Sequence, residues 1–168
     1  MQGDADAMAS AWRHAATAME RLPPGAATTG VFSVPCVEDP PYVATSLLLI
    51  RRYQDAAEAT SRIIETVYRP QSGDPRDQPT KYARTLLILG LAEAGLGRIE
   101  EASAAGNAAL GHGQLAWTTM VLAGKLDHVL AGSFPASTHT ADYHSRYIDA
   151  AERMARPAGR PRTRIPHE

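Results

Sequence analysis

The sequence has little of what many binding and catalytic chemistries require. It holds one cysteine, Cys36, so no intrachain disulfide can form, which favours a reducing compartment. Aromatic residues make up only 6% of the chain. No apolar run approaches the about 20 residues that cross a bilayer, and the N-terminus lacks the basic and apolar regions of a signal peptide. These absences predict a cytoplasmic protein with no membrane contact.

The charge of the chain is also nearly balanced. A formal net charge of −1 over 168 residues gives no general attraction to nucleic acid or anionic lipid. Residues 156–168 differ, since they hold four arginines and three prolines against one glutamate. That composition is typical of a solvated, disordered tail. We therefore expect one domain over residues 1–155, followed by a basic tail over residues 156–168.

Small aliphatic residues at helical spacing are abundant. Along the first segment, apolar residues recur in steps of four and three, at Met8, Trp12, Ala15, Met19 and Leu22. Prolines and glycines divide the remainder of the chain. The predicted helices span 4–22, 41–52, 54–68, 80–96, 99–110, 114–131 (ending at Gly132) and 138–155. The fourth is apolar almost all round between positions 86 and 91, so it should lie centrally. No strand pattern competes, which indicates an all-α fold of about seven helices.

Two of the predicted helix pairs share a local pattern. Residues 51–57 align with residues 97–103, so that Tyr53 and Ile99 coincide and each precedes an alanine by three positions. These alanines, Ala56 and Ala102, are 46 residues apart, and Ala11 lies 45 residues before Ala56. A repeated supersecondary unit at fixed spacing is the signature of a helical repeat protein.

Residues 83–114 resemble a tetratricopeptide repeat. The matching residues are Leu86, Leu89, Gly90, Gly97, Ala102 and Ala109. Departures are Glu93 in place of the usual Tyr, Gly106 in place of a bulky aromatic, and Gln114 in place of Pro. The resemblance implies antiparallel helix pairs in a right-handed α-α superhelix. Tetratricopeptide repeats are about 34 residues long, and two loops rich in proline and glycine, over 26–40 and 70–79, match the excess in the observed spacing. HEAT repeats of about 40–47 residues also fit this spacing and are the alternative. The tetratricopeptide type is preferred because the match over 83–114 is position-specific.

The segment from Trp117 to Ala150 resembles the closing section of certain bacterial proteins, in which a helix-turn-helix precedes divergent tetratricopeptide repeats. Residues 120–127 and 143–147 carry this resemblance. It implies a protein- or ligand-binding scaffold that forms the sensory or dimerising part of a transcriptional regulator. No helix-turn-helix motif is present here, so these residues are not expected to bind DNA directly. The alternative is a free-standing structural adaptor with no ligand switch.

Two surfaces are candidate binding sites for a protein or peptide partner. The inward positions of the helix over 80–96 would form a peptide groove from Tyr82, Arg84, Leu87, Leu91 and Ala94. An arginine beside leucines suits a peptide with an acidic group. The alternative is that Leu87 and Leu91 are simply core residues. A possible homodimer face combines Met8, Trp12, Ala15 and Met19, which would either pack on the helix over 41–52 or stay partly exposed.

No arrangement of residues points to catalysis. The six histidines lack the spacing of a zinc site, and Cys36 has no partner cysteine. Gly90, Gly95 and Gly97 fall in a helical pattern and do not follow a strand, as the glycines of a phosphate-binding loop would. No serine lies in a G-x-S-x-G context. The sequence therefore predicts a non-enzyme with no catalytic residue, no metal site and no cofactor.

Overall fold

The computed structural model describes residues 4–21, 41–68, 79–112 and 115–156. Within these ranges the chain forms seven α-helices and no strand, which confirms the predicted all-α fold. The helices are α1 (Ala5–Glu20), α2 (Pro41–Leu49), α3 (Tyr53–Val67), α4 (Pro79–Gly95), α5 (Ile99–Leu110), α6 (Trp117–Ser133) and α7 (Thr138–Ala155). The predicted tail after Arg156, the loop at 26–40 and the departure at Gln114 lie outside the described residues.

Several predicted helix boundaries differ from the structure. The second helix was expected to reach residue 52, but α2 ends at Leu49. The sixth was expected to begin at residue 114, but α6 begins at Trp117.

The sixth helix was expected to end at Gly132, but α6 continues through this glycine to Ser133. Pro135 explains the true end, because a proline disfavours the helical conformation in the residue before it. Phe134 accordingly has φ −137° and ψ 53°, and its N–H donates to the Leu130 carbonyl at 2.8 Å. A proline therefore ends this helix where a glycine was expected to do so.

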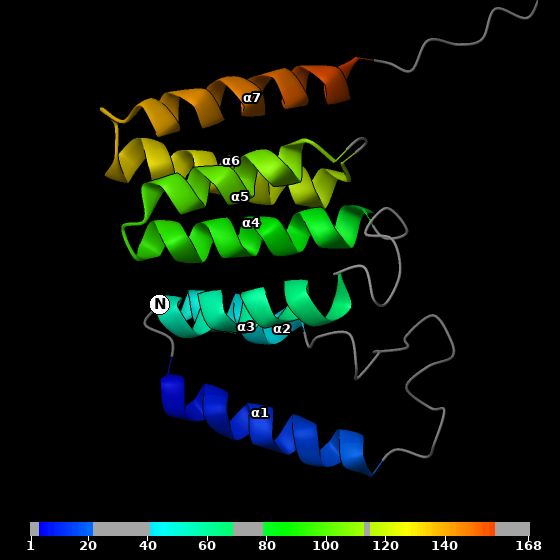
Figure 1. Cartoon of the computed structure of the whole chain (residues 1–168). Coiled ribbons are helices and arrows are strands. Elements are labelled where there is room, and N and C mark those ends of the chain that lie inside the picture. Colours follow the sequence, from blue (N-terminus) through cyan, green and yellow to red (C-terminus); the bar gives the residue numbers. More distant parts are fainter. Residues whose placement is uncertain (1–3, 22–40, 69–78, 113–114, 157–168) are drawn as a thin grey trace, which may run out of the picture.

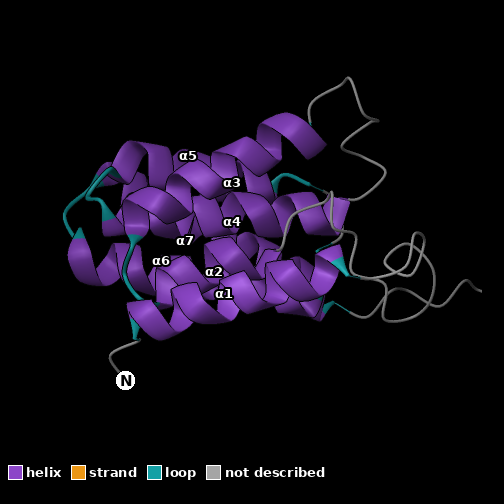
Figure 2. Ribbon diagram, turned by 90° about the horizontal axis from the view of Figure 1, so that it is seen from below, coloured by secondary structure: helices purple, strands orange, loops and turns teal. Residues whose placement is uncertain are grey.

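The helices stack in layers with their long axes roughly aligned, as Figures 1 and 2 show from two directions. In Figure 1 the order from one end to the other is α1, then α2 with α3, then α4, then α5 with α6, and finally α7. Short turns make α2 and α3, α4 and α5, and α6 and α7 antiparallel neighbours. The right-handed superhelical twist that the resemblance implies stays a prediction.

Helix α4 lies at the centre of the stack, as predicted. It packs against α2 and α3 on one side and against α5 and α6 on the other. Leu86, Leu87, Ile88 and Leu91 are consequently all buried, although they point in different directions around the helix. A helix that is apolar all round is stable only when neighbours cover every side of it.

The turns within the first two pairs have the same backbone geometry. Arg51 and Gly97 both adopt a left-handed conformation, with φ of 61° and 78°. The N–H groups of the next residues, Arg52 and Arg98, each donate to the carbonyl five residues earlier, at 2.9 Å in both turns. This is the hydrogen bond of a Schellman helix end. Residues 51–57 and 97–103 therefore share a turn geometry as well as a sequence pattern.

The three alanines that recur at spacings of 45 and 46 residues do not share one environment. Ala56 and Ala102 are fully buried, where a larger side chain would separate the helices of each pair. Ala11 is exposed on α1. Helix α1 therefore does not bury Ala11 against another described helix.

Arg51→Gly is expected to raise the free energy of unfolding by about 0.5 kcal/mol. A non-glycine residue in the left-handed region costs about 1–2 kcal/mol, and the greater freedom of glycine in the unfolded chain offsets part of that gain. Urea unfolding followed by circular dichroism measures the change. Gly97→Ala is the matched opposite and should lower stability by about 1 kcal/mol. If both substitutions changed the free energy of unfolding in the same direction, the two turns would not be equivalent.

Two departures from the tetratricopeptide pattern have local physical explanations. Glu93 is buried, and its Oε2 accepts a hydrogen bond from Arg98 Nη1 at 3.0 Å, while Arg98 Nη2 donates to Gln54 Oε1 at 3.0 Å. The Arg98 guanidinium thus links Glu93 of α4 to Gln54 at the start of α3. At Gly106, the space of the usual aromatic side chain is filled by the Tyr143 ring, which comes from α7.

Candidate binding groove between α6 and α7

The connection between α6 and α7 fixes how the two helices lie. Ser137 is the N-cap of α7, and its Oγ accepts a hydrogen bond from the His139 N–H at 3.2 Å. Thr140 Oγ1 donates to the Phe134 carbonyl at 2.9 Å, across the turn. An N-cap hydroxyl satisfies a backbone donor at the helix start. These two bonds direct α7 back along α6.

Near this turn the two helices are tightly joined. The Tyr143 hydroxyl donates to the Ala123 carbonyl at 3.1 Å, and the Tyr143 side chain is fully buried. His144 Nδ1 lies 3.0 Å from Asp127 Oδ1, so a polar contact also joins α7 to α6. Burial raises the pKa of Tyr143 far above its usual value, and the nearby Asp127 and Tyr147 raise it further. The neutral tyrosine is therefore strongly favoured in the fold.

Gly124 and Tyr147 lie where the contact between α6 and α7 gives way to a groove. A Cβ added to Gly124 would lie 2.7 Å from the Tyr147 hydroxyl oxygen, so the tyrosine can approach α6 only because Gly124 has no side chain. Beyond this pair, toward the start of α6 and the end of α7, the helices enclose a groove of about 380 Å³. The groove is lined by Trp117, Met120, Val121, Gly124, Tyr147, Ala151, Met154 and Ala155.

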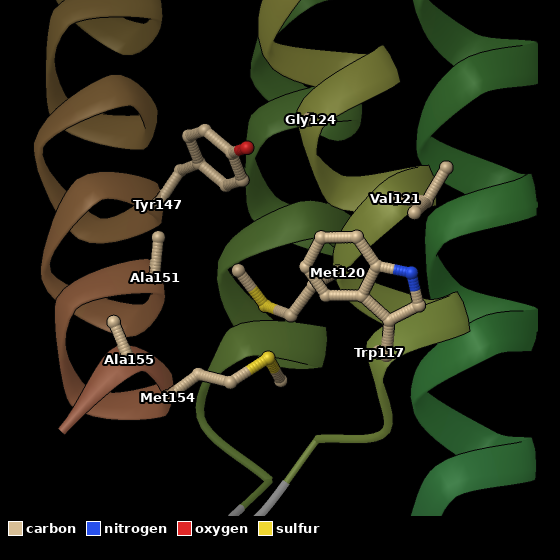
Figure 3. Close-up of a pocket in the computed structure, with 8 residues that line it drawn as sticks. All are labelled: Trp117, Met120, Val121, Gly124, Tyr147, Ala151, Met154 and Ala155. Carbon is tan, nitrogen blue, oxygen red and sulfur yellow. The ribbon is translucent and has the colours of Figure 1, made fainter. Parts of the chain in front are cut away.

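Figure 3 shows the two walls of this groove facing each other. Tyr147, Ala151 and Met154 come from α7, and Trp117 and Met120 come from α6. Trp117 is 73% exposed and Val121 is 55% exposed, although both are large apolar residues. Of the six large hydrophobic residues that are exposed in the described chain, four lie on α6 and α7. The end of the stack thus presents a concentrated apolar surface to solvent.

The side chains of the groove can bind a partner mainly by burying apolar surface. Tyr147 is the one titratable side chain among its eight lining residues. A ligand that covers the groove would gain stability from the removal of Trp117, Val121 and Met154 from water, at about 1.5–3 kcal/mol for each fully buried large side chain. Contiguous exposed apolar surface of this kind marks interaction sites on many proteins. The lining therefore suits an apolar face of a partner.

The candidate peptide groove on α4 has a different character. Leu87, Leu91 and Ala94 are buried in the main core, which is the alternative stated for the two leucines. Arg84 and Tyr82 are half-buried. The Tyr82 ring packs against two other rings, with centroid distances of 5.1 Å to Tyr68 and 4.9 Å to His112. In this conformation Leu87, Leu91 and Ala94 contact other core residues and are not part of an open surface.

The candidate dimer face on α1 is partly engaged with the rest of the chain. Met8 packs against a small buried cluster formed by Leu47, Ala56, Ala57 and Ala92. Trp12 is 52% exposed and Ala15 is exposed. The Met19 side chain lies outside the described residues. Of the two outcomes stated for this face, packing on the second helix or partial exposure, the described residues show packing at Met8 and exposure at Trp12.

The sequence contained a signal for the α6–α7 groove that the interpretation did not use. On α7, Tyr147, Ala151 and Met154 follow helical spacing at positions i, i+4 and i+7. On α6, Trp117 and Val121 fall four residues apart on one side, while Met120 and Ala123 are buried on another. A helix with apolar residues on two sides needs a second covering neighbour. The groove lies where that neighbour is absent from the described chain.

Comparison with protein-family models, curated proteins and solved structures found no match to this chain. The described residues contain no helix that is both long and apolar enough to cross a membrane. They also contain no cluster of three or more histidine, cysteine, aspartate or glutamate side chains that could hold a metal ion.

Proposed function

We propose that this chain is a cytoplasmic helical-repeat scaffold that binds the apolar face of a partner helix in the α6–α7 groove. The observation that carries this proposal is the exposure of Trp117 at the rim of an apolar groove of about 380 Å³. Tryptophan is enriched among the residues that dominate binding energy at protein interfaces. Its exposure on a free surface costs stability that a bound partner would recover.

The packing of the stack favours a helix as the partner. Helix α4 is covered by two helices on each side, whereas α6 packs against α4, α5 and α7 and keeps the Trp117 side open. A helix placed over this side would continue the layered arrangement of Figure 1. Repeat stacks bury their apolar faces through such neighbour contacts. Amphipathic helices that dock in grooves do so through residues at positions i, i+3 or i+4, and i+7.

Selection of binders from a library of amphipathic helical peptides tests this function. Peptides selected on the wild-type chain should bind Trp117→Glu at least tenfold more weakly, because a carboxylate in an apolar contact is costly to desolvate. Ala104→Glu adds the same charge to an exposed position of α5, which contributes no residue to the groove, and should leave affinity unchanged. Peptides that bind all three proteins equally would argue against the groove.

We propose further that the scaffold acts as the sensory or dimerising part of a bacterial transcriptional regulator. Support comes from the resemblance of residues 117–150, since these residues supply most of the groove lining and the Tyr143 and His144 contacts that join α6 to α7. A coding segment for a helix-turn-helix, in frame and directly upstream of Met1, would strengthen this proposal. Its absence would favour a structural adaptor with no ligand switch.

A further inference from the structure

Helix α1 is an amphipathic helix that makes few contacts with the other described helices. Asp4 caps it, because Asp4 Oδ1 accepts hydrogen bonds from the N–H groups of Asp6 and Ala7, both at 3.0 Å. Its apolar face is attached to the stack through Met8, while Trp12 stays 52% exposed. Figure 1 shows α1 diverging from α2 and α3 along its length. Within the described part of the chain, the apolar face of α1 is thus left open at Trp12.

The two uncovered apolar surfaces lie at opposite ends of the molecule. Figure 1 places α1 at one end of the stack and α7 at the other, with α2 to α6 between them. In this arrangement α1 lies away from the α6–α7 groove of its own chain. A second copy, however, would bring its α1 to this groove without any change in either stack.

The charges at the two ends agree with such a contact. A helix that continued the layers after α7 would run antiparallel to α7 and begin beside the end of α7. Arg153 and Arg156 lie at this end, next to the groove residues Met154 and Ala155. Glu152 also lies there, 3.9 Å from Arg156, so this end carries more positive than negative charge. Asp4 and Asp6 lie at the start of α1. In this orientation opposite charges meet, which favours one direction of docking over the reverse.

We propose that α1 of one copy of this chain occupies the α6–α7 groove of another, so that copies associate head to tail. This inference rests on the proposed function, and it names the helix that the groove takes. Trp12 of the entering helix lies against the groove walls formed by Met120, Tyr147 and Met154, while Met8 keeps its contact with the Leu47 cluster of its own chain. Such a contact is heterologous, since each copy contributes a different surface, and its products are chains of copies or a closed ring.

Two single variants and their mixture test the head-to-tail contact. Trp12→Glu damages the entering helix and keeps the groove, whereas Trp117→Glu damages the groove and keeps the helix. In sedimentation velocity at high micromolar concentration, the wild type should form concentration-dependent oligomers, and each variant alone should be a monomer. An equimolar mixture should form a heterodimer, because it retains one intact helix and one intact groove. Ala104→Glu should associate as the wild type does.

Several results would overturn the inference. These are a monomeric wild type, an oligomer that Trp12→Glu leaves intact, or a mixture of the two variants that stays monomeric. Loss of association in Trp117→Glu alone would indicate a symmetric contact between two grooves. A synthetic peptide of residues 4–21 gives an independent readout by calorimetry, since it should bind Trp12→Glu and should not bind Trp117→Glu. If this peptide fails while library peptides still require Trp117, the proposed function stands and the self-association is wrong.

Discussion

Replacing Tyr143 by alanine is expected to lower the free energy of unfolding by about 3–5 kcal/mol. Tyr143 is the largest of the fully buried side chains, and its ring fills the space over Gly106 between α5 and α7. Its removal leaves a cavity and also deletes the hydrogen bond to the Ala123 carbonyl. Urea unfolding monitored by circular dichroism measures the loss. A change below about 1 kcal/mol would contradict the position of α7.

Tyr143→Phe separates packing from hydrogen bonding. It keeps the ring and removes the hydroxyl, so the expected loss is only about 0.5–1.5 kcal/mol. The two proteins should also differ at alkaline pH. Burial raises the pKa of Tyr143, so the folded state retains this proton after the unfolded chain has lost it. The resulting stability is complete below about pH 10 and falls as the pH rises further, and Tyr143→Phe should lack this component of the loss.

Gly106→Ala is expected to destabilise the protein by about 2 kcal/mol, although glycine to alanine in a helix normally stabilises by up to about 1 kcal/mol. A Cβ at position 106 would lie 2.4 Å from Tyr143 Cε2 and 2.7 Å from Leu126 Cδ2. Both neighbours are fully buried, so neither can move aside without disturbing the core. Thermal and urea unfolding of the variant give the sign of the change as well as its size.

Gly132→Ala is the matched control for this substitution. It is also a helical glycine, but a Cβ there would meet nothing within 4 Å, so the usual stabilisation of about 0.5–1 kcal/mol should appear. The double variant Gly106→Ala with Tyr143→Ala tests the cause of the clash. Without the ring, most of the unfavourable effect of the new methyl group should disappear, which would show as strong non-additivity. Additive losses would mean that the two residues do not meet.

Much of the helical architecture could be predicted because it depends on local and repeated signals. The alignment of residues 51–57 with 97–103 predicted equivalent turns, and the left-handed Arg51 and Gly97 share that geometry. The all-round apolar character of residues 86–91 predicted a central α4. At Gly132 the local signal was misleading, because Pro135 three residues later determines where α6 ends.

The groove could not be predicted because it depends on a long-range contact. Tyr147 and Trp117 are 30 residues apart in sequence, and helical spacing cannot show which side of α6 is covered by α4 and which is left open. On α4, three of the five residues proposed for peptide binding are buried in the core: Leu87, Leu91 and Ala94. Leu87 and Leu91 have the spacing of a groove and also of a core, and only the packing of neighbouring helices distinguishes the two.

The central claim is that the α6–α7 groove binds an apolar helix, and methionine methyl resonances test it most directly. The chain has five methionines, of which Met120 and Met154 line the groove while Met8 packs on the cluster around Leu47. On titration of isotope-labelled protein with a library-selected helical peptide, the Met120 and Met154 methyl signals should shift and the Met8 signal should not. Binding that shifts Met8 alone, or that leaves both groove methionines unchanged, would contradict the account.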